Sequence, residues 1–349
     1  EEITAYTYDA NNRLIQTNRP DGSVETRTYD NAGRLIQQLD KDQSNNVLTQ
    51  FDFTYNAAGN VTQETNNLPE TPLPDEQTTM TYTSDNRLAT FNGQNVTYDA
   101  DGNMTSGPLD GQITNYTFDS RNRLTSVGTT SYTYDAENNR IGVNNNGTVY
   151  DYVINPNASL SQVLVRTGTN NSQTFYVYGL GLIGEQTGTD YKVYHYDLRG
   201  STVMLTDSTG ASTDTYQYGP YGEVINHTGS SATPFQYCGM YGIQNDGNGL
   251  YYMRARYYNP EIQRFVSKDN VEGIITNPLS LNLYTYCNNN PINFVDPTGH
   301  KTETVVDQNR HDYLYNLAYC TPDADPGNID WARHEYEMGN YTMEVFMAK

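Results

Sequence analysis

Side chains that could bind a metal ion lie in the last fifty residues. They show neither a CxxC nor an HxxxH spacing. Two short segments, 312–320 and 330–338, are predicted to be helices, so these side chains are better explained as residues on a helix surface. The residues of ligating type are His311, Cys320, His334 and Glu335. The sequence therefore predicts neither a metal site nor a cofactor.

A second group of chemically active residues lies in NNNPINFVDPTG at 288–299. Asn before Pro favours an extended or turn backbone. The run Asp296-Pro297-Thr298-Gly299 suits a β-turn with proline at its second position. With or without catalysis, this segment is expected to end the element before it.

Carboxylates dominate the charge of the chain. It has 41 acidic and 20 basic residues among 349, for a net charge of −21. Such a surface repels phosphate backbones and anionic membranes, so nucleic acid is not an expected partner. No apolar run of 18 residues predicts a membrane span. The opening EEITAYTYDA lacks the features of a signal peptide, and we expect a piece cut from a longer polypeptide or one whose leader lies upstream.

The elements that must position these residues come from a repeat of an aromatic residue followed by Asp, Asn or Thr. A turn with Gly or Asn follows each copy, then usually Arg or Asn and an aliphatic residue, as in Asn12-Arg13-Leu14. Gly and Asn tolerate the positive φ of tight hairpin turns, and the flanking runs alternate apolar with polar residues. Each copy therefore predicts one β-hairpin. The copies start at Tyr8, Tyr29, Tyr55, Tyr82, Tyr98, Phe118 and Tyr134.

Stacked hairpins must form a continuous sheet, because a single hairpin is only marginally stable. Tyrosine supplies 32 residues against 9 Phe and 1 Trp, so tyrosine rings are expected to be the main packing groups. We expect an all-β fold with repeats at 1–150, longer strands and Gly-rich turns at 151–299, and a short, mainly helical segment at 300–349.

Four stretches between 196 and 299 carry a resemblance. They read YDLRGSTVMLTD, YQYGPYGEV, GLYYMRARYYNPEIQRFVSKD and LNLYTYCNNNPINFVDPTG. In this order they resemble the rearrangement-hotspot (RHS) repeat-associated core, and the upstream units resemble YD repeats. Relatives include bacterial polymorphic toxins, cocoon-forming subunits of insecticidal toxin complexes and the YD shell of animal teneurins. The resemblance covers residues 1–299.

The resemblance implies a β-strand spiral that winds into a hollow shell. The core at 151–299 would plug one end, and the chain after DPTG would lie inside as payload. Spiralling the sheet would also remove most of its exposed edges. Seven YD units are few for a closed shell, so we expect a C-terminal fragment or a partial shell.

The resemblance also implies a self-cleavage site, because some family members cut themselves just after this motif. Carried over by motif, Asp269 is the aspartate of an aspartic-protease-like site and Arg264 is its neighbouring motif arginine. Asp296 lies beside the expected cut, after Gly299 or His300. Two carboxylates that share a proton can activate water and protonate the leaving group.

Two residues depart from the pattern of cleaving relatives. His300 stands where these usually carry Leu, and Asn270 stands where Pro usually follows the aspartate. No Asp lies between positions 270 and 295.

The second carboxylate would therefore be Glu272 or Asp296. The alternative to catalysis is a hydrogen-bonded ion pair between Asp269 and Arg264 that locks the plug.

Three functions follow from these observations. The first is a structural and delivery shell that encloses or presents a C-terminal segment, possible partners being an immunity protein or toxin-delivery components. The second is a single-turnover aspartic autoprotease. The third is an extracellular adhesin that binds a cell-surface glycan or protein through exposed tyrosines. The expected location is secreted or at the cell surface, in a bacterium, and no toxin activity is identifiable.

Overall fold

The computed structural model describes residues 3–69, 71, 78–273, 275, 278–300 and 302–304. Within these residues strands predominate, and the helical segments are three short 3-10 turns, so the all-β prediction is confirmed. No helix of the described part is long and apolar enough to cross a membrane. The helices expected at 312–320 and 330–338, and with them the metal-ligand candidates His311, Cys320, His334 and Glu335, lie outside the described residues.

The chain divides into two compact units, which we describe separately. The first contains residues 3–67 in an antiparallel meander of six strands that pair in sequence order. Phe51 and Phe53 stack in its interior, with ring centroids 6.5 Å apart. The strands are β1 (Ala5–Tyr8), β2 (Leu14–Asn18), β3 (Val24–Tyr29), β4 (Leu35–Lys41), β5 (Val47–Tyr55) and β6 (Val61–Asn66).

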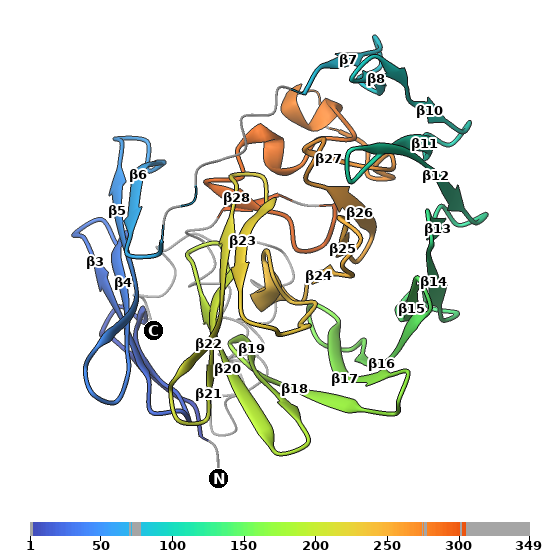
Figure 1. The fold of residues 1–349 in the computed structure, drawn as a ribbon. Coiled ribbons are helices and arrows are strands. Elements are labelled where there is room, and N and C mark those ends of the chain that lie inside the picture. The colour runs from blue at the N-terminus through green and yellow to red at the C-terminus, as the bar shows by residue number, and fades with distance from the viewer. Residues whose placement is uncertain are drawn as a thin grey trace, which may run out of the picture. The chain divides into compact units, whose positions relative to one another are not determined.

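The second unit, Leu68–Glu303, contains a 14-stranded antiparallel sheet, which we call the wall. Its strands β10 to β23 pair in sequence order, as the stacking of hairpins predicts, and follow one another along an arc (Figure 1). A three-stranded sheet, β7 (Met80–Tyr82), β8 (Leu88–Phe91) and β9 (Gln94–Asn95), precedes them.

The strands of the wall are β10 (Thr97–Tyr98), β11 (Met104–Leu109), β12 (Gln112–Phe118), β13 (Leu124–Val127), β14 (Thr130–Tyr134), β15 (Arg140–Asn145), β16 (Thr148–Asn155), β17 (Gln162–Gly168), β18 (Gln173–Gly179), β19 (Gly181–Thr187), β20 (Asp190–Tyr196), β21 (Thr202–Asp207), β22 (Ser212–Tyr218) and β23 (Val224–Thr228). The sheet continues without a break through residue 150, where the sequence pattern changes.

The described residues between 233 and 300 form a plug that lies inside the curve of the wall (Figure 1). Its centre is the four-stranded sheet β24 to β27. Its elements are η1 (Gly239–Tyr241), β24 (Gln244–Asn245), β25 (Tyr251–Met253), β26 (Arg256–Asn259), β27 (Arg264–Phe265), η2 (Pro278–Leu281), η3 (Cys287–Asn289) and β28 (Phe294–Val295). The last described strand is β29 (Glu303–Thr304).

The turns of the YD copies that carry aspartate are closed by that aspartate. In the first copy, Asp9 Oδ1 accepts the backbone N–H groups of Asn11 and Arg13, both at 2.9 Å. Asp9 Oδ2 accepts Arg13 Nε at 2.7 Å, and Asn12 has the positive φ, 59°, that the turn requires. We call this arrangement the clasp. It recurs in the pairs Asp30–Arg34, Asp42–Asn46, Asp99–Asn103, Asp119–Arg123 and Asp135–Asn139.

The tyrosine of one YD unit links it to the preceding unit. The ring centroid of Tyr29 lies 4.7 Å from the Arg13 guanidinium, and the Tyr29 hydroxyl donates to the carbonyl of Leu14 at 2.7 Å. A cation over an aromatic face is a favourable contact, and the hydroxyl satisfies a backbone acceptor. The same links join Tyr55 to Arg34 and Leu35, and Tyr134 to Arg123 and Leu124.

Wall and plug share one hydrophobic core, in which tyrosine is the most frequent residue type. At its centre, the fully buried Arg140 of β15 pairs with Asp246 and donates to Gln244 Oε1 at 2.6 Å. Its guanidinium lies 4.2 Å from the ring centroid of Tyr252 and 5.6 Å from that of Tyr132. One side chain of the wall thus binds two polar groups of the plug, Asp246 and Gln244, and packs on a plug tyrosine, Tyr252.

Candidate functional site

The DPTG turn is held by three consecutive residues: Arg254 and Ala255, which connect β25 to β26, and Arg256, the first residue of β26. Arg254 Nη1 donates to the carbonyl of Pro297 at 2.6 Å, and the N–H of Ala255 donates to that of Thr298 at 3.2 Å. Arg256 Nε donates to the carbonyl of Gly299. Three successive donors therefore bind three successive carbonyl oxygens. We call this arrangement the DPTG clamp.

The clamp needs an unusual backbone at Gly299. Its φ is +76°, and a Cβ there would lie 2.3 Å from the carbonyl oxygen of Met253. Asp296 closes the same turn from the inside. Its Oδ1 accepts the N–H groups of Gly299 at 2.9 Å and His300 at 3.1 Å, which is the role that aspartate plays in turns.

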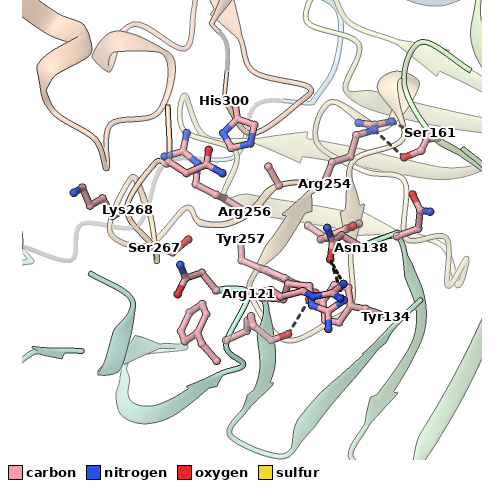
Figure 2. Close-up of a pocket in the computed structure, with 18 residues that line it drawn as sticks. Arg121, Tyr134, Asn138, Ser161, Arg254, Arg256, Tyr257, Ser267, Lys268 and His300 are labelled. Carbon is pink, nitrogen blue, oxygen red and sulfur yellow. Dashed lines mark hydrogen bonds between the residues drawn. The ribbon is translucent and has the colours of Figure 1, made fainter. Parts of the chain in front are cut away.

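Asp269 joins this site through Arg256 and His300. Its Oδ2 lies 2.7 Å from Arg256 Nη2, and its Oδ1 lies 2.7 Å from His300 Nδ1. Arg256 Nη2 is also 3.9 Å from Asp296 Oδ2, so one guanidinium faces both candidate carboxylates. In Figure 2, Arg256 and His300 lie next to each other at the edge of a cavity. The structure thus brings together Asp269, Asp296, Gly299 and His300.

Arg264 lies outside this cluster. Its Nη1 donates to the carbonyl of Asn86 at 2.6 Å, and its guanidinium stacks 4.2 Å from the ring centroid of Tyr82. The expected ion pair between Asp269 and Arg264 is therefore wrong, because the partner of Asp269 is Arg256. The backbone explains this placement. Arg264 forms an antiparallel β-bridge with Thr285, and its side chain extends to the turn between β7 and β8.

Burial and ion pairing act in opposite directions on the groups of the site. Burial by itself would raise the pKa of Asp269, but the hydrogen bond from His300 and the charge of Arg256 outweigh it and lower that pKa. Burial lowers the pKa of Arg256, although Asp269 and Asp296 oppose the change. The pair remains charged at neutral pH, since a guanidinium keeps its proton in proteins.

The geometry differs from that of two carboxylates that share a proton. Such a dyad raises the pKa of one member, whereas here Arg256 faces both Asp269 and Asp296. Glu272, the other candidate for the second carboxylate, has an exposed side chain. The site can polarise the Gly299 carbonyl through Arg256 and hold the N–H of His300 at a carboxylate.

Sequence reasoning missed Arg254 and Arg256 as the residues that hold the turn. The available signal was the pair of arginines in the run Arg254-Ala255-Arg256. The hairpin turn, in which Arg254 has a positive φ of 56°, brings both guanidinium groups to the DPTG turn. Among the described residues, no group of three or more His, Cys, Asp or Glu side chains could hold a metal ion.

Comparisons with known proteins place this arrangement in a family. The family model described as Teneurin YD-shell matches residues 7–292. The tRNA(Glu)-specific nuclease WapA of Bacillus subtilis subsp. natto is 36% identical over 148 residues, which are 41% of this chain and 6% of that protein. Toxin subunit YenC1 of Yersinia entomophaga is 36% identical over 118 residues, 33% of this chain and 12% of that protein. The chain thus spans a small part of the length of these relatives.

Solved structures show the same fold. The crystal structure of TcdB2-TccC3 matches with a TM-score of 0.62 at 20% identity, over 85% of this chain and 20% of that one. The structure of TcdB2-TccC3-Cdc42 matches with a TM-score of 0.61 at 19% identity, over 89% and 20% respectively. With a family model that covers most of the chain, the repeated YD hairpins and the plug lead to one conclusion: the chain belongs to the teneurin YD-shell family, among the RHS and YD-repeat proteins.

Proposed function

We propose that this chain is the end of a YD shell that encloses or presents the segment following Gly299. The observation that carries the proposal is the DPTG clamp, in which Arg254, Ala255 and Arg256 bind the carbonyl oxygens of Pro297, Thr298 and Gly299. Two of these three donors are guanidinium groups, and charge-assisted hydrogen bonds are among the stronger polar contacts in proteins. They fix the position of Gly299 at the plug.

Protease accessibility tests this function. We would digest the full chain briefly with a non-specific protease and follow peptides from the segment after residue 300 by mass spectrometry. If the clamp restrains that segment, it is cut more slowly in the wild-type chain than in Arg256→Gln, because the variant releases the Gly299 carbonyl.

The control is Arg264→Gln, which removes an arginine of the same plug that does not touch the DPTG turn. Equal cutting rates in the wild type and Arg256→Gln, with both variants folded by circular dichroism, would contradict the proposal.

Self-cleavage between Gly299 and His300 is a second candidate, favoured by a specific observation. Arg256 Nε donates to the carbonyl that would be attacked, and Asp296 Oδ1 accepts the N–H of the bond that would break. Water would add to the Gly299 carbon and give a proton to the Asp269 carboxylate as base. A proton from Asp296 would reach the His300 nitrogen as the C–N bond breaks.

Intact-mass spectrometry tests this reaction. The freshly purified chain would be incubated at several values between pH 4 and pH 8, because the reaction needs one carboxyl as base and one as acid. The expected product is a fragment that begins at His300. Asp269→Asn and Asp296→Asn should prevent its appearance, whereas Asp207→Asn, in a turn of the wall, should not. A wild-type mass that never changes would remove the reaction.

We infer the wider role of the parent protein from its relatives. These are named as tRNA nucleases and as toxin subunits, and the chain spans only a small part of them. We place this shell in a bacterial toxin-delivery protein that works outside its producing cell, with delivery components and an immunity protein as partners. No observation on the described residues favours the glycan-binding alternative, which stays a prediction.

A further inference from the structure

A cavity of about 350 Å³ lies between the wall and the plug. Its wall side is formed by two YD turns, around Arg121 and Asn138, and its plug side by Arg254, Arg256 and Lys268 (Figure 2). Sites for small ligands occupy about 300–1,000 Å³, so the volume suits a compact molecule. All lining residues belong to the unit Leu68–Glu303.

The charge of the lining is opposite to that of the whole chain. Its described residues include five cationic side chains and no carboxylate, although the chain has 41 acidic and 20 basic residues. The five cations are Arg121, Arg123, Arg254, Arg256 and Lys268. The carboxylates that pair with Arg123 and Arg256 belong to Asp119 and Asp269, which are not part of the lining.

The cations are arranged from the floor of the cavity to its rim. Arg256 is 5% exposed, whereas Arg121 and Lys268 are exposed. Arg121 Nη1 donates to the neutral carbonyl of Ala136 at 3.0 Å and to Asn138 Oδ1 at 3.2 Å. These contacts orient the guanidinium without neutralising it, so the positive charge at the rim remains.

We propose that this cavity binds a compact polyanion, either a phosphate-bearing small molecule or a polycarboxylate. Arginine forks match the paired oxygens of both groups, and a bound anion would offset the cost of grouping like charges in a partly desolvated cavity. The hydroxyl of Ser267 and the amides of Asn122 and Asn270 supply further hydrogen-bond donors around the charges. The site does not depend on cleavage or on the payload.

Isothermal titration of the full chain tests the inference with two probes, pyrophosphate and citrate, at constant ionic strength. We expect saturable binding of at least one probe and no matching heat from chloride. Binding of pyrophosphate alone identifies phosphate chemistry, and binding of citrate alone identifies carboxylate chemistry. Arg121→Gln and Lys268→Gln should each weaken binding roughly ten-fold, because each removes a charge-assisted hydrogen bond worth about 1.5 kcal/mol or more.

The matched control is Lys41→Gln, which removes the same kind of charge from β4 in the other unit. It should bind the probes like the wild type, and the thermal unfolding midpoints of all variants in chloride report on folding. The inference is overturned if neither probe binds at millimolar concentration, or if Arg121→Gln and Lys268→Gln bind as tightly as Lys41→Gln.

Discussion

At the scale of single residues, Arg256 organises the site. It joins the Gly299 carbonyl, the Leu283 carbonyl and the Asp269 carboxylate, and its guanidinium lies 3.6 Å from the ring centroid of Phe265. A buried charge needs partners, because its solvation is lost. The pairing also decides what Asp269 can do: with Arg256 and His300 beside it, its carboxyl stays ionised, which suits a base and a structural anchor alike.

The first prediction concerns Asp269→Asn. We expect a loss of about 2 kcal/mol in the free energy of unfolding, because the variant removes the charge opposite a buried arginine. Chemical denaturation at pH 7 measures this loss. The matched control is Asp207→Asn, whose carboxylate closes an exposed turn and should cost less. Equal losses for the two variants would contradict the role given to the ion pair.

The second prediction concerns the pH dependence of the same group. The pKa of Asp269 is lowered in the folded chain, so its contribution is complete above the unfolded value of about 3.9 and is lost as pH falls through the lowered value. Unfolding midpoints measured from pH 7 to pH 2 should therefore fall more in the wild type than in Asp269→Asn. Parallel curves would show that Asp269 does not carry the effect.

At the scale of elements, the clasp explains which residue types occur in the repeat and at which positions. In the copies at Asp9, Asp30 and Asp119, the aspartate closes its own turn, the arginine four residues later binds it, and the tyrosine of the next hairpin covers that arginine. Tyr, Asp and Arg are therefore consecutive parts of one chain of contacts along the sheet. The spacing of the hairpins could be predicted from the sequence, but the binding of arginine under the next tyrosine could not, because it joins residues of different hairpins.

The third prediction is a test of the clasp. Arg123→Gln should lower the free energy of unfolding by about 1 kcal/mol, because it loses the ion pair with Asp119 and the contact with the Tyr134 ring. Arg121→Gln changes a neighbouring arginine of the same turn that makes neither contact. Denaturant unfolding of both variants should show the larger loss for Arg123→Gln, and the reverse order would refute the clasp.

The fourth prediction concerns the DPTG clamp as an element. Gly299→Ala should destabilise the turn by more than the roughly 1 kcal/mol that a positive φ costs an alanine, because its Cβ would collide with the Met253 carbonyl. Gly147→Ala is the control: its φ is +89°, and nothing lies within 4 Å of the added Cβ. Hydrogen exchange of the Ala255 amide should accelerate only in Gly299→Ala, and unchanged exchange would count against the clamp.

At the scale of the molecule, the unit Leu68–Glu303 depends on the contact between wall and plug. The plug lies inside the curve of the wall (Figure 1), and buried tyrosines of the wall share one core with Phe235, Tyr252 and Tyr257 of the plug. Arg140 is the polar centre of this contact, because it binds Asp246 and Gln244 and packs on the Tyr252 ring. Wall and plug are therefore expected to unfold together.

The fifth prediction follows from this contact. Arg140→Met should lower the stability of the unit by about 3 kcal/mol, because it leaves Asp246 buried without its ion-pair partner. Arg264→Met is the control, since it also loses a contact with a tyrosine ring but leaves no buried carboxylate without an ion-pair partner. Hydrogen exchange should rise in both β15 and β24 of Arg140→Met. A rise confined to β15 would mean that wall and plug are not coupled there.

The sequence by itself determined the strands, the turns and their order. Those features depend on contacts between residues that are near in sequence: the alternation along each strand, the Gly or Asn of each turn and the pairing of successive hairpins. The DPTG turn could also be predicted, from turn chemistry. The family resemblance singled out Asp269 and Asp296, and their part in cleavage stays a prediction.

Only the tertiary structure decided which side chains pair across the fold. Asp269 binds Arg256, thirteen residues away, and not the nearer Arg264, because β26 directs Arg256 toward the DPTG turn while Arg264 reaches the β7–β8 turn. The cationic cavity likewise combines turns of the wall with residues of the plug. Such contacts depend on how distant segments pack, and a pattern within either segment alone does not contain that information.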